Sequence, residues 1–167
     1  MDAQKKKLTG EAIMGQLEKC GITHIVWVPD SEVKFMYENM MNHKDITLIP
    51  VCREGEAPGV AAGLAIGGKR PATLFQCSGL YDAGDAVRAL VIGLNLPVLM
   101  MVGYRGWKYG EPMTDSAGTF LEPTLKAWGI KYYLIESDDD VGRISAGYEE
   151  ALKRKQPVAI LIPKERK

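Results

Sequence analysis

Short apolar runs alternate with amphipathic segments along the whole chain. The apolar runs have the length of β-strands, and strands are predicted at 24–29, 46–51, 72–77, 97–103, 131–135 and 157–163. The segments between them have helical spacing, and helices are predicted at 8–21, 31–43, 54–68, 81–94, 119–128 and 138–154. Several strands are continuously apolar, as expected when helices cover both faces of a sheet. The pattern predicts an α/β fold with a doubly wound, mostly parallel, six-stranded sheet.

Local signals refine the predicted boundaries. Thr9 is suited to cap the first helix, and Gly21 is suited to end it. The apolar face of the second helix is predicted to consist of Val33, Met36, Tyr37, Met40 and Met41. A long glycine-rich loop is expected at 103–118. We expect a single domain over residues 1–167, with a short mobile N-terminus at 1–7 and a mobile tail at 164–167.

Composition and charge exclude several classes of function. The 167 residues are 46% hydrophobic and 25% charged, which is typical of a globular protein. Lys plus Arg and Asp plus Glu both number 21, so no basic field attracts nucleic acid or a membrane surface. No apolar window approaches ~18 residues, and no secretory signal is visible, so we expect a cytoplasmic protein. Three cysteines without a CxxC pair and two histidines predict neither a disulfide framework nor a metal site.

Polar residues follow four of the predicted strands at their carboxyl ends. These segments are Pro29–Asp30–Ser31, Cys52–Arg53–Glu54, Cys77–Ser78–Gly79 and Gly103–Tyr104–Arg105. Ligands of open parallel sheets bind beyond the carboxyl ends of the strands. Any one of these polar side chains can be a simple helix cap. Because all four loops share the pattern, we expect a site at this edge of the sheet.

Glu54 is the strongest single candidate. It follows the strand at 46–51 and precedes APGVAAGLAIGG, a helical segment almost free of large side chains. The end of a strand holds a carboxylate at a fixed point, and small helix residues let a backbone or a flat ligand come close. Such a carboxylate is suited to proton transfer. The chain contains no GxGxxG, no Walker motif and no GxSxG elbow around Ser78.

These residues resemble the pyrimidine-binding (PYR) domain of thiamine-diphosphate enzymes. In that family a glutamate precedes an Ala/Gly-rich helix with a glycine nine positions later, which Gly63 matches. Further segments are similar to sulfopyruvate and phosphonopyruvate decarboxylases: VPDSEVK at 28–34, GGKRPATLFQCSGL at 67–80, and VGYRG at 102–106 followed by Glu111–Pro112. The chain departs from the family at Tyr81–Asp82, after SGL. It also lacks the histidine that phosphonopyruvate-type enzymes carry soon after the Glu–Pro pair, since Thr114 lies in this region.

The resemblance implies a role for each candidate residue. Glu54 would hydrogen-bond the aminopyrimidine of thiamine diphosphate and activate the cofactor. Pro29, Ser78 and Gly79 would lie against the cofactor, and Ser31 and Asp30 would lie near the carboxylate of a small anionic 2-oxo acid. Arg53 and Arg105 are candidates to bind its second acidic group through a forked donor. For Arg53 an ion pair with Glu54 is an equal alternative.

The resemblance also implies a partner. The family's enzymes need a pyrophosphate-binding (PP) domain whose GDG…N motif holds Mg²⁺, and this chain has no such motif. The chain therefore resembles the alpha subunit of a two-chain decarboxylase. The PP domain would lie on a beta subunit, in a hetero-oligomer with at least two copies of each chain. Two alternatives remain at this stage: a subunit of an acetolactate-type carboligase, and a non-catalytic, flavodoxin-like binding module.

Overall fold

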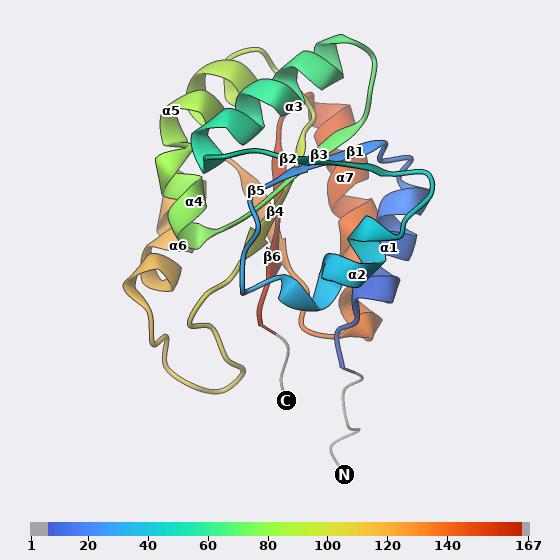
Figure 1. Cartoon of the computed structure of the whole chain (residues 1–167). Helices are drawn as coiled ribbons and strands as arrows, with labels where there is room; N and C mark the ends of the chain where they lie inside the picture. Colours follow the sequence, from blue (N-terminus) through green and yellow to red (C-terminus); the bar gives the residue numbers. More distant parts are fainter. Residues whose placement is uncertain (1–6, 165–167) are drawn as a thin grey trace.

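The computed structural model describes residues 7–164, which form one α/β domain built on a six-stranded sheet (Figure 1). The ends expected to be mobile, 1–7 and 164–167, lie outside the described residues except for Lys7 and Lys164. All strand pairs are parallel, and the strand order is β2-β1-β3-β4-β6-β5. The strands are β1 (His24–Trp27), β2 (Thr47–Pro50), β3 (Pro71–Gln76), β4 (Leu99–Gly103), β5 (Lys131–Leu134) and β6 (Val158–Ile162). The predicted fold class is confirmed.

Burial explains which strands have continuous apolar sequences. The central strands β3, β4 and β6 are buried along nearly their whole length, whereas β2 and β5 lie at the two edges and are partly exposed. A strand with both faces covered by helices needs apolar side chains at every position. The continuous runs in the sequence are therefore the strands at the centre of the sheet.

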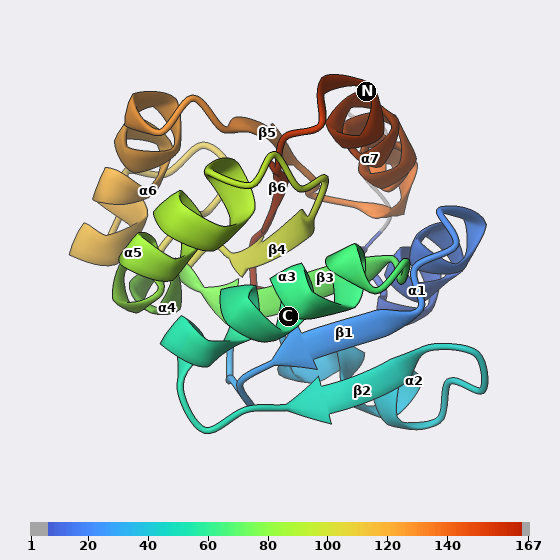
Figure 2. The same ribbon diagram turned by 90° about the horizontal axis from the view of Figure 1, so that it is seen from above.

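Helices cover the two faces of the sheet as two layers (Figure 2). The first layer contains α1 (Gly10–Lys19), α2 (Tyr37–Met41) and α7 (Gly142–Arg154), whose buried side chains form one core cluster with the sheet. The second layer contains α3 (Ala57–Ile66), α4 (Cys77–Asp82), α5 (Gly84–Ala86), the π-helical turn η3 (Val87–Ile92) and α6 (Ser116–Ala127). Short 3₁₀ turns precede three helices: η1 (Lys34–Met36), η2 (Glu54–Glu56) and η4 (Asp138–Asp140).

The helix predicted at 31–43 is much shorter in the structure. The Asp30 carboxylate accepts a hydrogen bond from the Glu32 backbone N–H, so the chain turns there instead of entering a helix. Regular helix covers only Tyr37–Met41, after the turn η1. Of the predicted apolar face, Val33, Met36 and Met40 are buried, but Tyr37 and Met41 are exposed. The prediction was wrong for these two side chains. The regular helix is too short for all five apolar residues to lie on one face that packs against the core.

Two other helices begin earlier than predicted. The helix predicted to begin at Tyr81 begins at Cys77, directly after β3, so Ser78 and Gly79 lie in its first turn and not in a loop. It is also divided into α4, α5 and the π-helical turn η3. The helix predicted at 119–128 begins at Ser116, because the Asp115 side chain accepts from Ala117 N–H and caps it. By contrast, Thr9 caps α1 as predicted, accepting from Ala12 N–H.

Register places the carboxyl ends of the central strands at one edge. Trp27 of β1 is level with Pro50 and Leu74, and Gln76 of β3 is level with Gly103 of β4. The chain leaves β1 toward β2 on one side, while β3 lies on the other, so the strand order reverses between β1 and β3. Crevices at such reversals are the usual ligand sites of open α/β sheets.

Candidate functional site

The Glu54 side chain lies at this edge, packed against the first turn of α4. It begins η2, directly after β2 and its loop, and it is half-buried. A Cβ atom added to Gly79 would lie 2.5 Å from Glu54 Cγ and 2.9 Å from Oε1. Glu54 therefore occupies the space that only a glycine at position 79 leaves open. Among residues 7–164, no side chain or backbone N–H donates a hydrogen bond to its carboxylate. Its oxygens are available to a ligand.

An ion pair attaches the Glu54 loop to α4. Arg53 Nε lies 3.2 and 3.0 Å from the two carboxylate oxygens of Asp82, and Arg53 Nη2 lies 2.6 Å from Oδ1. The Gly55 backbone N–H donates to the same carboxylate at 3.2 Å. The Arg53 hydrogen bonds hold the pKa of Asp82 below its ordinary value, so the carboxylate is ionised at neutral pH. Residues on both sides of Glu54 are thus bound to one side chain of α4.

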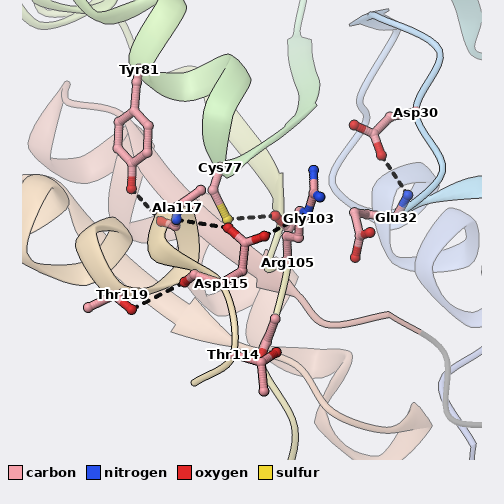
Figure 3. A network of polar contacts seen from close by, with 11 residues as sticks. Asp30, Glu32, Cys77, Tyr81, Gly103, Arg105, Thr114, Asp115, Ala117 and Thr119 are labelled. Carbon is pink, nitrogen blue, oxygen red and sulfur yellow. Dashed lines mark hydrogen bonds and ion pairs between the residues drawn. The ribbon is translucent and has the colours of Figure 1, made fainter. Parts of the chain in front are cut away.

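Arg105 is paired as well. Its Nε lies 3.0 Å from Asp115 Oδ2, and Asp115 also caps α6 through Ala117 N–H (Figure 3). Trp107, in the same loop, stacks on Tyr104 with ring centroids 6.3 Å apart. Both predicted substrate arginines therefore already hold a carboxylate, Asp82 for Arg53 and Asp115 for Arg105. The alternative ion pair between Arg53 and Glu54 is replaced by the pair with Asp82.

The loop after β1 contributes a second carboxyl that the sequence did not indicate. Pro29 and Ser31 are exposed and Asp30 is half-buried, whereas the next side chain, Glu32, is only 8% exposed. Burial raises the pKa of the Glu32 carboxyl above its ordinary value. The sequence signal was weak, because Glu32 stands in a polar run, SEVK, that reads as the exposed start of a helix.

Cys77 and Tyr81 have structural contacts in this region. The Cys77 thiol donates to the Gly103 carbonyl at 3.0 Å, and burial raises its pKa to about 11. The Tyr81 hydroxyl donates to the Ala117 carbonyl at 2.6 Å, which joins α4 to α6, and burial raises its pKa to about 12. Both groups are therefore neutral near pH 7 and unsuited to act as nucleophiles. Tyr81 and Asp82, the departure from the family pattern, bind α4 to its two neighbours.

The predicted residues, together with Glu32 and Asp82, form two groups at one edge of the sheet. Glu54, Gly79 and the pair Arg53–Asp82 form the first group, at the ends of β2 and β3. Asp30, Ser31 and Glu32 form the second group with Arg105, at the ends of β1 and β4. Ser78 is exposed at the start of α4.

A heteroaromatic cofactor fits the first group. Glu54 offers a carboxyl with unoccupied hydrogen-bonding positions, held against the backbone of α4 at Gly79. Within the described residues, no group of three or more His, Cys, Asp or Glu side chains is placed to hold a metal ion. Likewise, no helix over 7–164 is long and apolar enough to cross a membrane.

Comparisons with known proteins agree with this geometry. Residues 8–110 match the family described as thiamine pyrophosphate enzyme, N-terminal TPP binding domain. The chain is 30% identical over 154 residues to a sulfopyruvate decarboxylase subunit alpha of Methanococcus maripaludis, covering 91% of this chain and 92% of that one. It is also 30% identical to the subunit of the same name from Methanocaldococcus jannaschii, covering 90% of each chain. A phosphonopyruvate decarboxylase of Streptomyces hygroscopicus is 22% identical, with 93% of this chain and 40% of that protein covered.

A solved structure shares the fold. It is the X-ray structure of an enzyme from Mycobacterium smegmatis, described as thiamin diphosphate-dependent, with a TM-score of 0.71 and 21% identity. The match covers 95% of this chain and 31% of that chain, so our chain spans about a third of its length. Together with the family match over residues 8–110, these findings show that the chain belongs to the thiamine pyrophosphate enzymes, as an N-terminal TPP binding domain.

Proposed function

We propose that this chain is the PYR-domain subunit of a two-chain, thiamine-diphosphate-dependent enzyme that decarboxylates a small anionic 2-oxo acid such as sulfopyruvate. The observation that supports this most directly is the Glu54 carboxyl, which packs on Gly79 with no hydrogen bond from the described residues. Similarity to named sulfopyruvate decarboxylase alpha subunits over nearly the whole chain supports the substrate class.

Glu54 is proposed to hold a proton between its carboxyl oxygen and a ring nitrogen of the cofactor's aminopyrimidine. When bound, thiamine diphosphate supplies an electron sink for the electron pair released with carbon dioxide. The backbone around Glu54 is held by Asp82, through Arg53 and the Gly55 N–H, so the carboxyl is positioned before any ligand arrives. Positioning of this kind removes an entropic cost from the reaction.

The second group is proposed to bind the substrate. Ser31 offers an exposed hydroxyl for a hydrogen bond to the 2-oxo acid, with Asp30 beside it and Pro29 against the cofactor. Arg105 can share its guanidinium between Asp115 and the substrate's acidic group, because its contact with Asp115 is an ion pair at Nε, 3.0 Å from Oδ2, without a bidentate hydrogen bond. Arg53 uses both Nε and Nη2 on Asp82, which makes Arg105 the better candidate of the two.

The surface of α3 supports a partner chain. No side chain from Ala57 to Ile66 is charged, yet Gly63 and Ile66 are exposed, and Leu90 and Leu94 are exposed on the neighbouring segment. A helix that is apolar on all sides is normally buried. We propose that a beta subunit with a PP domain covers this surface and holds Mg²⁺ and the diphosphate.

Co-purification with a PP-domain polypeptide tests the proposal. The mixture, with Mg²⁺ and thiamine diphosphate, is given a panel of 2-oxo acids that includes sulfopyruvate and phosphonopyruvate. Mass spectrometry then identifies the products. We expect carbon dioxide and an aldehyde. A larger hydroxy-ketone would instead indicate carboligation, and a chain that forms no complex and binds no cofactor would contradict the proposal.

A further inference from the structure

The Glu32 side chain is largely buried, and no residue among 7–164 donates a hydrogen bond to its carboxyl. Only 8% of the residue is exposed, and its backbone N–H donates a hydrogen bond to Asp30. Burying an ionisable group without a partner costs free energy, so such groups are rare unless they are used. No residue of the Glu54 group contacts it.

Glu32 lies over the ends of β3 and β4. A Cβ atom added to Gly103 would lie 3.0 Å from Glu32 Cβ and 3.6 Å from Gln76, the residue level with Gly103 on β3. Figure 3 shows the Glu32 carboxyl between the Asp30 turn and Arg105. The side-chain oxygen of Gln76 is also buried without a partner. The absence of a side chain at Gly103 therefore lets Glu32 reach the middle of the sheet edge.

Glu32 and Glu54 lie close to two ends of one short segment, residues 76–79. Glu32 is placed beside Gln76, and Glu54 is packed on Gly79, three residues later. Three residues of chain span at most about 10 Å. Both side chains therefore lie near the start of α4, Glu32 by Gln76 and Glu54 by Gly79.

Charges of both signs lie around Glu32. Lys164 and Arg105 favour its ionised form, whereas Asp30 and Asp115 favour the protonated form. Asp115 is also paired with Arg105, which weakens the effect of that guanidinium on Glu32. Burial is the largest influence, and it favours the protonated carboxyl.

We propose that Glu32 is a second acid–base residue of the site, which gives a proton to the substrate carbon beside Ser31. This inference rests on the proposed function. Loss of carbon dioxide from a 2-oxo acid anion yields an aldehyde only if one proton is taken up. The C–C bond to the carboxylate breaks, and its electron pair ends in the new C–H bond, whose proton comes from Glu32. Glu32 regains a proton from water through a cavity of about 760 Å³, which it lines with Ser31 and Lys164.

Glu32→Gln tests the proposal in the complex with the PP-domain partner, using sulfopyruvate. We expect the cofactor affinity to change by less than about twofold and kcat to fall by about 10²–10⁴. In a single turnover, carbon dioxide release stays close to the wild-type rate while aldehyde formation is slowed. The fall of the wild-type rate as pH rises through the Glu32 pKa disappears in the variant. Glu38→Gln, an exposed side chain lining the same cavity, is the matched control and leaves all these quantities unchanged.

A measurement without turnover separates this inference from the proposed function. A carboxyl with a raised pKa binds its proton more tightly in the folded state, so stability falls as pH rises from the ordinary glutamate range through the folded pKa. We expect the Tm of Glu32→Gln, relative to wild type, to increase over that interval and then to level off. A constant difference in Tm overturns the proposal. So does wild-type aldehyde formation by Glu32→Gln.

Failure of the proposed function and failure of the inference about Glu32 give different results. If no 2-oxo acid is decarboxylated by the wild-type complex while the Tm difference follows pH, the proposed function fails, and with it the proton transfer from Glu32. Should Glu32→Gln not fold, Glu32→Asp keeps the acid but shortens it by one methylene. It should keep the pH dependence at a lower rate, and a Glu32→Asp rate equal to wild type at every pH overturns the inference.

Discussion

The two helical layers of this domain differ in the polarity of their outer surfaces. In the first layer, α7 buries Ile144, Gly147, Tyr148 and Ala151 on one stripe and presents charged residues to the outside. In the second layer, α3 has no charged residue, and its side away from the sheet is apolar and partly exposed. The outer face of α7 is therefore suited to contact with water. The second layer has the composition of a surface that another protein covers.

The second layer, which has the partly exposed apolar surface, also follows most of the loops that contain the site residues. The chain leaves β2 through Glu54 into α3, leaves β3 directly into α4, and leaves β4 through Arg105 into α6. Of the loops that contain site residues, only the loop after β1, with Ser31 and Glu32, leads to the first layer. Chemistry and partner docking are therefore built by the same loops and helices, which is why substitutions in the second layer should affect both.

Glu54→Gln should have the largest effect. The amide keeps the size of the side chain but cannot share a proton, so we expect turnover by the complex to fall by about 10²–10⁴. Association with the partner, measured by calorimetry, should be unchanged. Glu149→Gln, an exposed position on α7 in the first layer, is the control. Full activity of Glu54→Gln would mean that a substitution at the site in the second layer has no more effect than the control in the first layer.

Gly79→Ala should come next, because its Cβ would occupy the space of Glu54 Cγ. Helix propensity favours alanine by about 1 kcal/mol, and overpacking costs about 1–3 kcal/mol, so the free energy of unfolding should change by less than about 2 kcal/mol. Displacing Glu54 by an ångström can cost up to about 10² in rate. In Gly142→Ala, at the start of α7, the new Cβ meets no atom within 4 Å. Its kcat should match wild type, and an equal loss in both variants would point to a general effect on folding.

Leu90→Asp tests the partly exposed apolar surface formed by α3 and the neighbouring segment with Leu90 and Leu94. Leu90 is 37% exposed beside Gly59 of α3, while Leu152, on α7, is 41% exposed on the opposite layer. A buried leucine contributes about 1.5–3 kcal/mol, so replacing an interface leucine by a charge should weaken association about tenfold or more. Leu152→Asp should leave the affinity for the partner unchanged. Equal affinities of the two variants in biolayer interferometry would mean that the partner does not dock on α3.

The sequence predicted features that depend on local patterns and missed those that depend on distant pairing. The sheet and the cap at Thr9 follow from the hydrophobic periodicity and from local capping preferences. The position of Glu54 follows from the rule that sites of parallel sheets lie at the carboxyl ends of the strands. The pair Arg53–Asp82 joins residues 29 positions apart, which no local pattern reveals. Glu32 was missed for a related reason: its burial depends on Gly103, on another strand.

Asp82→Asn should have the smallest effect, and its value is in showing whether α4 positions Glu54. An exposed ion pair contributes little because water and salt screen it, so we expect the Kd of thiamine diphosphate in the complex to rise by about fivefold or less. Because the hydrogen bonds from Arg53 hold the pKa of Asp82 below its ordinary value, the pair persists throughout the neutral range and is lost only as pH falls through that lowered pKa. Wild type and variant should therefore differ by a constant factor from pH 6 to 8, set by geometry alone. Asp85→Asn removes another exposed ion pair of the same layer, with Arg88, which does not contact the Glu54 loop. If Asp85→Asn raised the Kd as much as Asp82→Asn, the contribution of Asp82 would be general surface charge and not the positioning of Glu54.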